Sequence, residues 1–117
     1  MIQIELFATL FLLVQLFHSV EELSTGFHKR WYLTKLSFKT FLIFEIIHNL
    51  FWTGVVLIKS VPYRKELLFF FFALMFVNGV QHIVWFGFKK KYVPGLITAP
   101  IHIVLFLFFY FQFIKFV

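Results

Sequence analysis

Four long apolar runs, separated by short polar segments, constrain the fold of this chain more than any other feature. The runs cover residues 3–23, 38–58, 67–88 and 95–116. Each is about 20 residues long, the length at which an α-helix crosses a hydrocarbon layer about 30 Å thick. Membrane-barrel strands alternate between apolar and polar residues, and these runs do not. The pattern therefore predicts an all-α fold, a bundle of four transmembrane helices in a single domain over residues 1–117.

The composition is that of a membrane protein rather than of a soluble domain. Hydrophobic residues make up 62% of the chain, 21 of its 117 residues are phenylalanine, and its mean hydropathy is +0.92. A soluble core of this size could not bury so many phenylalanines, whereas lipid tails solvate them. The chain has no cysteine, which excludes disulfides, thiolate nucleophiles and cysteine-ligated metals. We therefore expect a multi-pass integral membrane protein.

The net charge of +6 does not indicate nucleic-acid binding, because the basic residues lie between the apolar runs. In these positions Lys and Arg meet lipid headgroups and set the topology. The first and third polar segments carry more Lys and Arg than the second segment and the C-terminal end. The positive-inside rule then predicts that the first and third segments face the cytoplasm and the termini do not. The expected partner is membrane lipid, with no nucleic acid; the oligomeric state is left open.

Ionisable side chains interrupt each apolar run at a similar depth. His18 lies near the end of the first run, Glu45 and His48 near the start of the second, His82 near the end of the third and His102 near the start of the fourth. At 1.5 Å per residue, all of them fall roughly 7–15 Å below the surface that the first and third segments share. Ionisable residues are costly in a bilayer and tend to mark functional sites. The sequence therefore predicts a polar pocket near one membrane face.

Helical spacing also predicts one polar face on each run. His18 is followed by Glu21 and Glu22 at i+3 and i+4, which are neighbouring positions on a helix. The same spacing recurs in the other three runs: Glu45, His48 and Asn49; Asn78 and His82; Thr98 and His102. Taken singly, the amide and hydroxyl residues among these fit hydrogen bonds that pack helices together better than they fit metal ligation.

A pocket with several carboxylates and imidazoles needs charge compensation in a low-dielectric setting. A bound divalent metal supplies it, and so does proton sharing between His and Glu pairs. Glu45 and His48 have the Glu-x-x-His spacing that di-iron bundles use. His18 and Glu22 partly resemble a zinc-binding helix, with a Glu in place of its second His. Oxygen and nitrogen ligands without sulfur suit zinc, iron or manganese and do not choose among them.

The leading hypothesis is a metal-dependent membrane enzyme, a hydrolase or an oxidoreductase, that acts on a lipid or another apolar substrate. The predicted metal ligands are His18, Glu22, Glu45, His48, His82 and His102. Glu21 and Glu22 are the predicted catalytic carboxylates, and Asn49 and Asn78 are expected to orient the ligands. One alternative is a metal-free acid–base enzyme of the lipid isomerase type. The other is a membrane protein that transports protons or metal ions through the same groups.

An ordered set of strings resembles the family of small bacterial membrane proteins named for its HXXEE motif. The strings are His18-x-x-Glu21-Glu22, Glu45-x-x-His48-Asn49, Asn78-x-x-x-His82 and Tyr92-Val93-Pro94-Gly95. The resemblance spans nearly the whole chain. It implies a compact helical domain in the bacterial cytoplasmic membrane. Because the activity of this family is uncharacterised, it supports the choice of residues and supplies no reaction.

Overall fold

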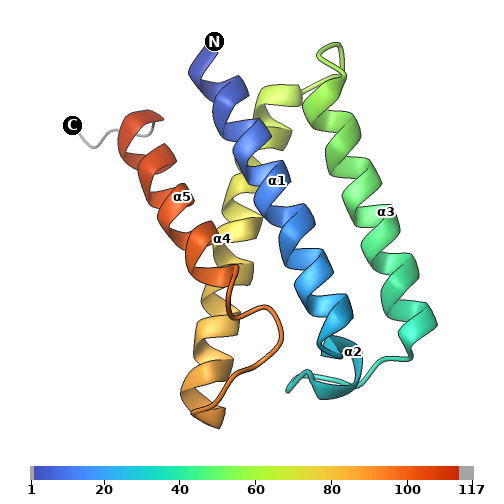
Figure 1. The fold of residues 1–117 in the computed structure, drawn as a ribbon. Helices are drawn as coiled ribbons and strands as arrows, with labels where there is room; N and C mark the ends of the chain where they lie inside the picture. The colour runs from blue at the N-terminus through green and yellow to red at the C-terminus, as the bar shows by residue number, and fades with distance from the viewer. Residues whose placement is uncertain (1, 114–117) are drawn as a thin grey trace.

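The computed structural model describes residues 2–113 and is all-helical, with no strand among those residues. The helices are α1 (Ile2–Ser24), α2 (Phe27–Arg30), α3 (Phe38–Leu57), α4 (Arg64–Lys89) and α5 (Ala99–Phe113). The four longer helices form a bundle, and α2 is a single turn that follows α1 (Figure 1). The predicted all-α bundle is confirmed.

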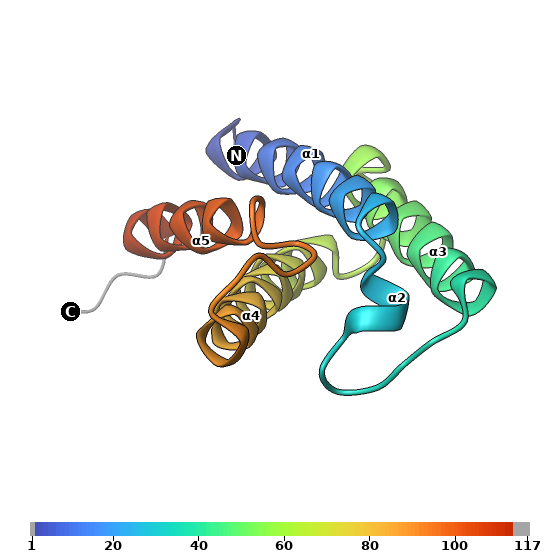
Figure 2. The same ribbon diagram turned by 60° about the horizontal axis from the view of Figure 1, so that its bottom comes forward.

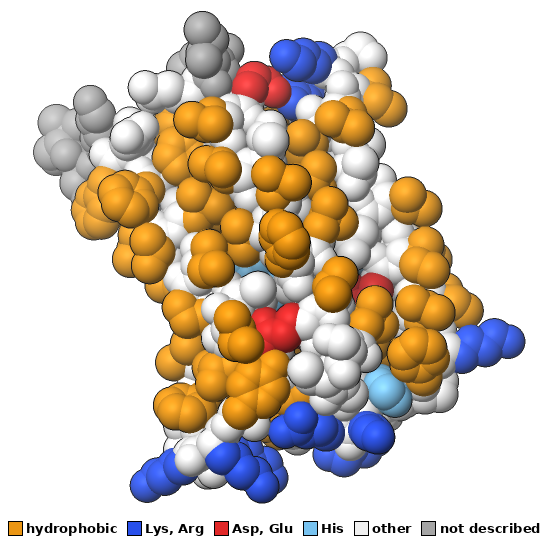
Figure 3. All heavy atoms as spheres, in the orientation of Figure 1, with side chains coloured by type: hydrophobic (Ala, Val, Ile, Leu, Met, Phe, Trp, Pro, Cys, Tyr) orange, Lys and Arg blue, Asp and Glu red, His pale blue; other side chains and the backbone are white. Residues whose placement is uncertain are grey.

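Three helices are long and apolar enough to cross a membrane, over Gln3–Ser24, Phe38–Leu57 and Arg64–Lys89. α5 is apolar as well but has 15 residues in the described part of the chain. Figure 3 shows a broad apolar face with Lys and Arg gathered at the two ends of the molecule. These features indicate a membrane protein, and a fourth span through α5 stays a prediction.

The fourth apolar run departs from its predicted bounds of 95–116 at its start. Gly95 has a φ of +90°, a left-handed conformation that no helix continues through and that favours glycine. Residues 95–98 therefore belong to the loop that precedes α5, and the helix begins at Ala99. Pro100 falls in its first turn, where the missing N–H is not needed. The predicted end at residue 116 lies outside the described residues.

One half of the bundle is packed with aromatic side chains. The ring centroids of Phe11 and Phe72 are 4.3 Å apart in a stacked arrangement, and those of Trp52 and Phe71 are 4.6 Å apart. Phe109 of α5 meets the edge of Phe72 at 4.7 Å. These five side chains are at most 4% exposed and belong to one hydrophobic cluster contributed by α1, α3, α4 and α5.

An arginine clamp lies at the outer end of this aromatic half. The guanidinium of Arg64 donates two hydrogen bonds of 2.7 Å to the two oxygens of Glu5. It also donates to the carbonyl oxygens of Val55 and Val56, which the end of α3 leaves free. One side chain thus ties the starts of α1 and α4 to the end of α3.

At the other end of the bundle, α2 lies between α3 and α4 (Figure 2). Its Phe27 stacks on Phe41 of α3 at 4.9 Å and meets the edge of Trp85 of α4 at 5.8 Å. Ser37 caps the start of α3, because its hydroxyl accepts a hydrogen bond from the Thr40 backbone N–H. The buried polar side chains of the four long helices lie between this small core and the aromatic half.

Candidate metal centre

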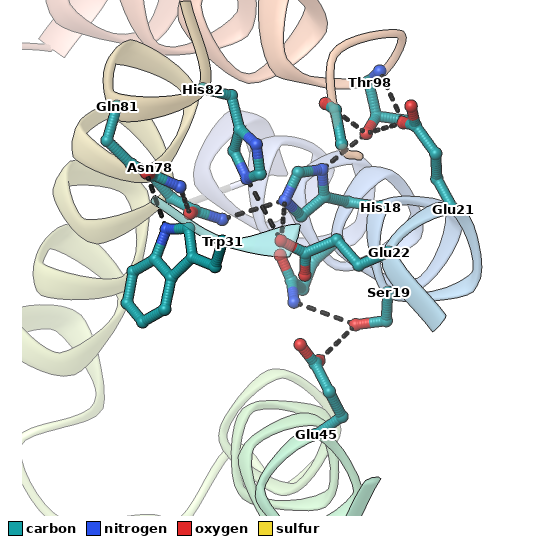
Figure 4. A network of polar contacts seen from close by, with 12 residues as sticks. His18, Ser19, Glu21, Glu22, Trp31, Glu45, Asn78, Gln81, His82 and Thr98 are labelled. Carbon is teal, nitrogen blue, oxygen red and sulfur yellow. Dashed lines mark hydrogen bonds and ion pairs between the residues drawn. The ribbon is translucent and has the colours of Figure 1, made fainter. Parts of the chain in front are cut away.

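Three buried side chains from α1 and α4 bring potential metal-binding atoms together: His18, Glu22 and His82. Glu22 Oε2 lies 3.3 Å from His18 Nε2 and 3.1 Å from His82 Nε2 (Figure 4). Two bonds of about 2.1 Å that meet at about 90–110° place their outer atoms about 3.0–3.4 Å apart. The separations therefore fit neighbouring ligands on one ion.

The helices explain how these side chains meet. His18 and Glu22 are one turn apart on α1, so they project from the same side of that helix. His82 comes from α4, and its ring lies edge-on to that of His18 with centroids 4.7 Å apart. The loop before α5 closes over both rings, since a Cβ on Gly95 would clash with His82 and His18. No solvent reaches either ring, and Glu22 is 4% exposed.

The hydrogen bonds around His18 define what its two nitrogens can do. The Thr98 hydroxyl donates to Glu21 Oε1 at 2.8 Å, so its oxygen is left to accept the Nδ1–H of His18. The neutral ring then has its lone pair on Nε2, the atom that faces Glu22. Asn78 Nδ2 lies 3.1 Å from the same Nε2 and can donate to it. A lone pair beside a carboxylate is repulsive unless a proton or a cation lies between them.

His82 and His102 are the least satisfied polar side chains of the site. Both are 0% exposed, and neither ring nitrogen of either residue has a hydrogen-bond partner among the described residues. Buried imidazoles without partners are rare in folded proteins. His82 Nε2 faces Glu22 at ion-pair distance, whereas His102 packs edge-on against His18 with ring centroids 5.2 Å apart. His82 is therefore available as a ligand within the cluster, and His102 lies beside it.

Glu45 lies next to the cluster, but it accepts a hydrogen bond from Ser19, which is not a member of the cluster. Ser19 Oγ donates to Glu45 Oε2 at 2.7 Å, and Asn49 Nδ2 donates to Ser19 Oγ at 2.9 Å. Gln15 Nε2 contacts both Ser19 Oγ and Asn49 Oδ1 at 3.2 Å, which completes a polar contact between α1 and α3. Glu45 is 4% exposed and interacts electrostatically with Glu22. Two buried carboxyl groups, those of Glu22 on α1 and Glu45 on α3, thus lie close enough to interact electrostatically.

A cavity of about 470 Å³ adjoins these carboxyl groups. Its walls are mostly apolar, with a small polar set of Gln15, Glu22, Glu45, His48, Asn78 and Gln81. Near this polar set, Trp31 Nε1 donates to Gln81 Oε1 at 3.2 Å, which joins the α2 segment to α4 (Figure 4). An apolar chamber with a few convergent polar groups is the usual form of a small-molecule site.

Residues 9–110 match a protein family described as "Protein of unknown function with HXXEE motif". The chain belongs to this family. No curated protein and no solved structure matched the chain in the other two comparisons. The His and the two Glu of the motif are His18, Glu21 and Glu22.

The two glutamates of the HXXEE motif point to different sides of its histidine. Glu22 meets the Nε2 side, within the cluster, while Glu21 meets the loop on the Nδ1 side (Figure 4). The Glu21 carboxylate accepts hydrogen bonds from the Tyr92 hydroxyl, the backbone N–H of Ile97, and both the N–H and the hydroxyl of Thr98. Burial and this carboxylate raise the pKa of Tyr92, so the phenol stays a donor. Glu21 therefore holds the loop against α1, and its predicted catalytic role remains a prediction.

The other predicted residues lie around the HXXEE cluster. His48 is partly exposed on the cavity wall, and its Nε2 accepts from Trp52 Nε1 on the same helix at 3.2 Å. Asn78 contacts His18, whereas Asn49 contacts Ser19 and so lies on the Glu45 side. Ser19 was not predicted, although its place beside His18 in the polar string was a usable signal. Their roles as ligands or orienting residues stay predictions.

Proposed function

We propose that this HXXEE protein is a metal-dependent enzyme that acts within the membrane on a lipid or another apolar substrate. The observation that carries the proposal is the fully buried His82, whose Nε2 has no hydrogen bond and lies 3.1 Å from the Glu22 carboxylate beside His18. A divalent cation would bind the lone pair of His82 Nε2 and neutralise Glu22 at once. Without such a cation, the fold buries an imidazole whose Nδ1 has no hydrogen-bond partner and whose Nε2 has only the Glu22 carboxylate beside it.

The ligand set supports a catalytic site rather than a structural one. Two histidines and one carboxylate leave coordination positions open, as in the zinc sites of metallohydrolases and in non-haem iron oxygenases. A metal there would polarise a substrate carbonyl or activate an attacking water molecule. Zinc would favour hydrolysis and iron would favour oxidation, so the metal decides between a hydrolase and an oxidoreductase.

The surroundings of the cluster support a role for Glu45 as the acid–base group. Its carboxyl lines the cavity that Glu22 also lines, so a substrate in the cavity meets both. Ser19 holds one Glu45 oxygen from α1, which fixes the side chain between the cluster and α3. A proton could then pass between substrate and Glu45 while the substrate contacts the cluster.

A metal-free acid–base enzyme is the second candidate, and one contact favours it. Asn78 already donates to His18 Nε2, and an ion on that nitrogen would have to replace the hydrogen bond, because Nε2 has one lone pair. Glu22 and Glu45 also interact as a pair, which would allow them to share a proton. In the metal-free enzyme, Glu45 would still be the acid–base group, and no cation would be bound.

Metal analysis of protein purified in mild detergent separates the two candidates. We expect bound zinc, iron or manganese in stoichiometric amount, and its loss in His18→Gln and His82→Gln. His28→Gln is the matched control, since His28 lies on α2 outside the cluster, and it should keep the metal. Parent protein that binds none of the three metals, even after incubation with each, would exclude the metal enzyme and leave the acid–base candidate.

A further inference from the structure

The cavity beside the cluster opens sideways between two helices. α1 forms its back wall with Gln15 and Glu22, and no residue of α5 lines it. Phe44 of α3 and Val77 of α4 both line the cavity, yet they are 58% and 60% exposed. A side chain that lines the cavity and is also exposed on the protein surface lies at the mouth of the cavity. The mouth therefore lies between α3 and α4.

The position of the mouth places it at membrane depth. Phe44 and Val77 both lie within helices that are long and apolar enough to cross a bilayer. α2 closes one end of the gap between α3 and α4, because its Phe27 packs against Phe41 of α3 and Trp85 of α4. A ligand that enters past Phe44 and Val77 therefore arrives from the hydrocarbon layer rather than from water.

The lining changes character from the mouth to the interior. Phe44, Leu74 and Val77 make the outer part apolar, whereas Glu22 and Glu45 lie on the α1 side, next to the metal cluster. A hydrocarbon chain suits the outer part, and a polar linkage suits the inner part. Together they select an amphiphile rather than a uniformly apolar molecule.

Positive charge borders the end of the cavity that α2 closes. Residues 25–44 contain no Asp or Glu, and their basic side chains are Lys29, Arg30, Lys35 and Lys39. Trp31 and Leu36 of this segment line the cavity, and Lys35 Nζ donates to the Trp31 carbonyl at 3.0 Å. Basic side chains at this level attract anionic headgroups at a membrane surface.

We propose that the cavity binds one hydrocarbon chain of an anionic phospholipid. The chain enters between Phe44 and Val77, the headgroup lies at the basic segment 25–39, and the linkage between them lies beside Glu22 and Glu45. As a statement about the substrate, this proposal rests on the proposed function. As a statement about binding, it stands on the cavity, its mouth and the basic segment alone.

A photoactivatable phosphatidylglycerol with a diazirine in its acyl chain tests the binding in vesicles. We expect it to label α3 near Phe44 and α4 near Val77, as mapped by peptide mass spectrometry. Val77→Trp should block the mouth and lower this labelling several-fold. Val104→Trp is the matched control: Val104 lies on α5, is 51% exposed and does not line the cavity, so its labelling should equal that of the parent.

The headgroup preference is tested with the same diazirine on phosphatidylcholine, which should label the cavity several-fold less. Equal labelling by the two lipids, or equal labelling of Val77→Trp and Val104→Trp, would overturn the proposal. Metal analysis of the Val77→Trp variant keeps the two proposals apart. Retained metal with lost labelling supports both, whereas labelling of a protein that binds no metal would support lipid binding and contradict only the metal enzyme.

Discussion

The two halves of this bundle are held together by different forces. In one half, stacked aromatic rings from α1, α3, α4 and α5 fill the interior, and Arg64 ties three helices at the outer end. In the other half, the helices meet through His18, Glu22 and His82, and a cavity of about 470 Å³ separates α3 from α4. The aromatic half is closely packed, whereas the polar half holds the buried His and Glu side chains and the open space.

The difference follows from what lipid does to packing. Apolar side chains gain little by leaving lipid for the protein interior, so helices associate through close packing and hydrogen bonds. Rings such as Phe11 and Phe72 provide that packing without a polar group. The imidazoles of His82 and His102 have no hydrogen-bond partner among the described residues, so the polar half gains less from such contacts. The aromatic half also fills the space between the cluster and the Arg64 end, which disfavours an ion path through one chain.

The largest effect should come from the aromatic half. Phe72→Ala removes a fully buried ring and leaves a cavity, which should lower the free energy of unfolding by about 3–5 kcal/mol in mixed micelles. Phe111→Ala, at a position 67% exposed, should change it by less than about 0.5 kcal/mol. Similar losses in the two variants would show that the aromatic half is not the closely packed part.

Metal removal should give the next largest effect and acts on the polar half. A metal present at about 100 times its Kd stabilises the folded protein by roughly 2.7 kcal/mol, and a chelator should remove that stability. The melting temperature in detergent should therefore fall on chelation and recover when the metal is restored. The His82→Gln variant should show no response to the chelator.

Glu45→Gln sharpens the same test, because it removes a charge beside Glu22 at nearly constant shape. If Glu22 and Glu45 form a metal-free carboxyl pair, the substitution relieves their repulsion and should raise the melting temperature. The melting temperature of the parent should then not respond to chelation. If the site binds a metal, the melting temperature of the parent should fall on chelation. Glu45→Gln then removes a carboxylate that attracts the bound cation, so the variant should melt at a lower temperature than the parent. The two candidates thus predict opposite signs.

The sequence predicted the long helices better than the packing between them. Long apolar runs give α1, α3 and α4 directly, because their length and composition are local properties. The start of α5 was misplaced, since the apolar run continues through Gly95 while the backbone there turns left-handed. The short helix α2 was not predicted, because Phe27 is held by tertiary contacts with Phe41 and Trp85.

In the site, depth along the helices was predictable, but rotation about them was not. His18 and His82 do lie at one level and meet. His48 was grouped with them by depth, yet its ring bonds to Trp52 on its own helix. Glu21 and Glu22 are both helical neighbours of His18, but successive residues are turned by about 100°. They therefore lie on either side of His18, and only the packing of the 92–98 loop shows which one faces the cluster.

The smallest effect tests the link between that loop and the cluster. Thr98→Val keeps the shape of the side chain but removes the hydroxyl that accepts from His18 Nδ1 and donates to Glu21. Losing these bonds should cost about 1 kcal/mol of stability. Without them the His18 ring loses its fixed tautomer and orientation, so metal affinity should fall roughly 10–100-fold. Thr98→Ser retains the hydroxyl and should restore affinity to near the parent value. If Thr98→Val lowers stability while the affinity, measured by competition with a chelating dye, stays unchanged, then the loop only closes the polar half and does not orient its histidine.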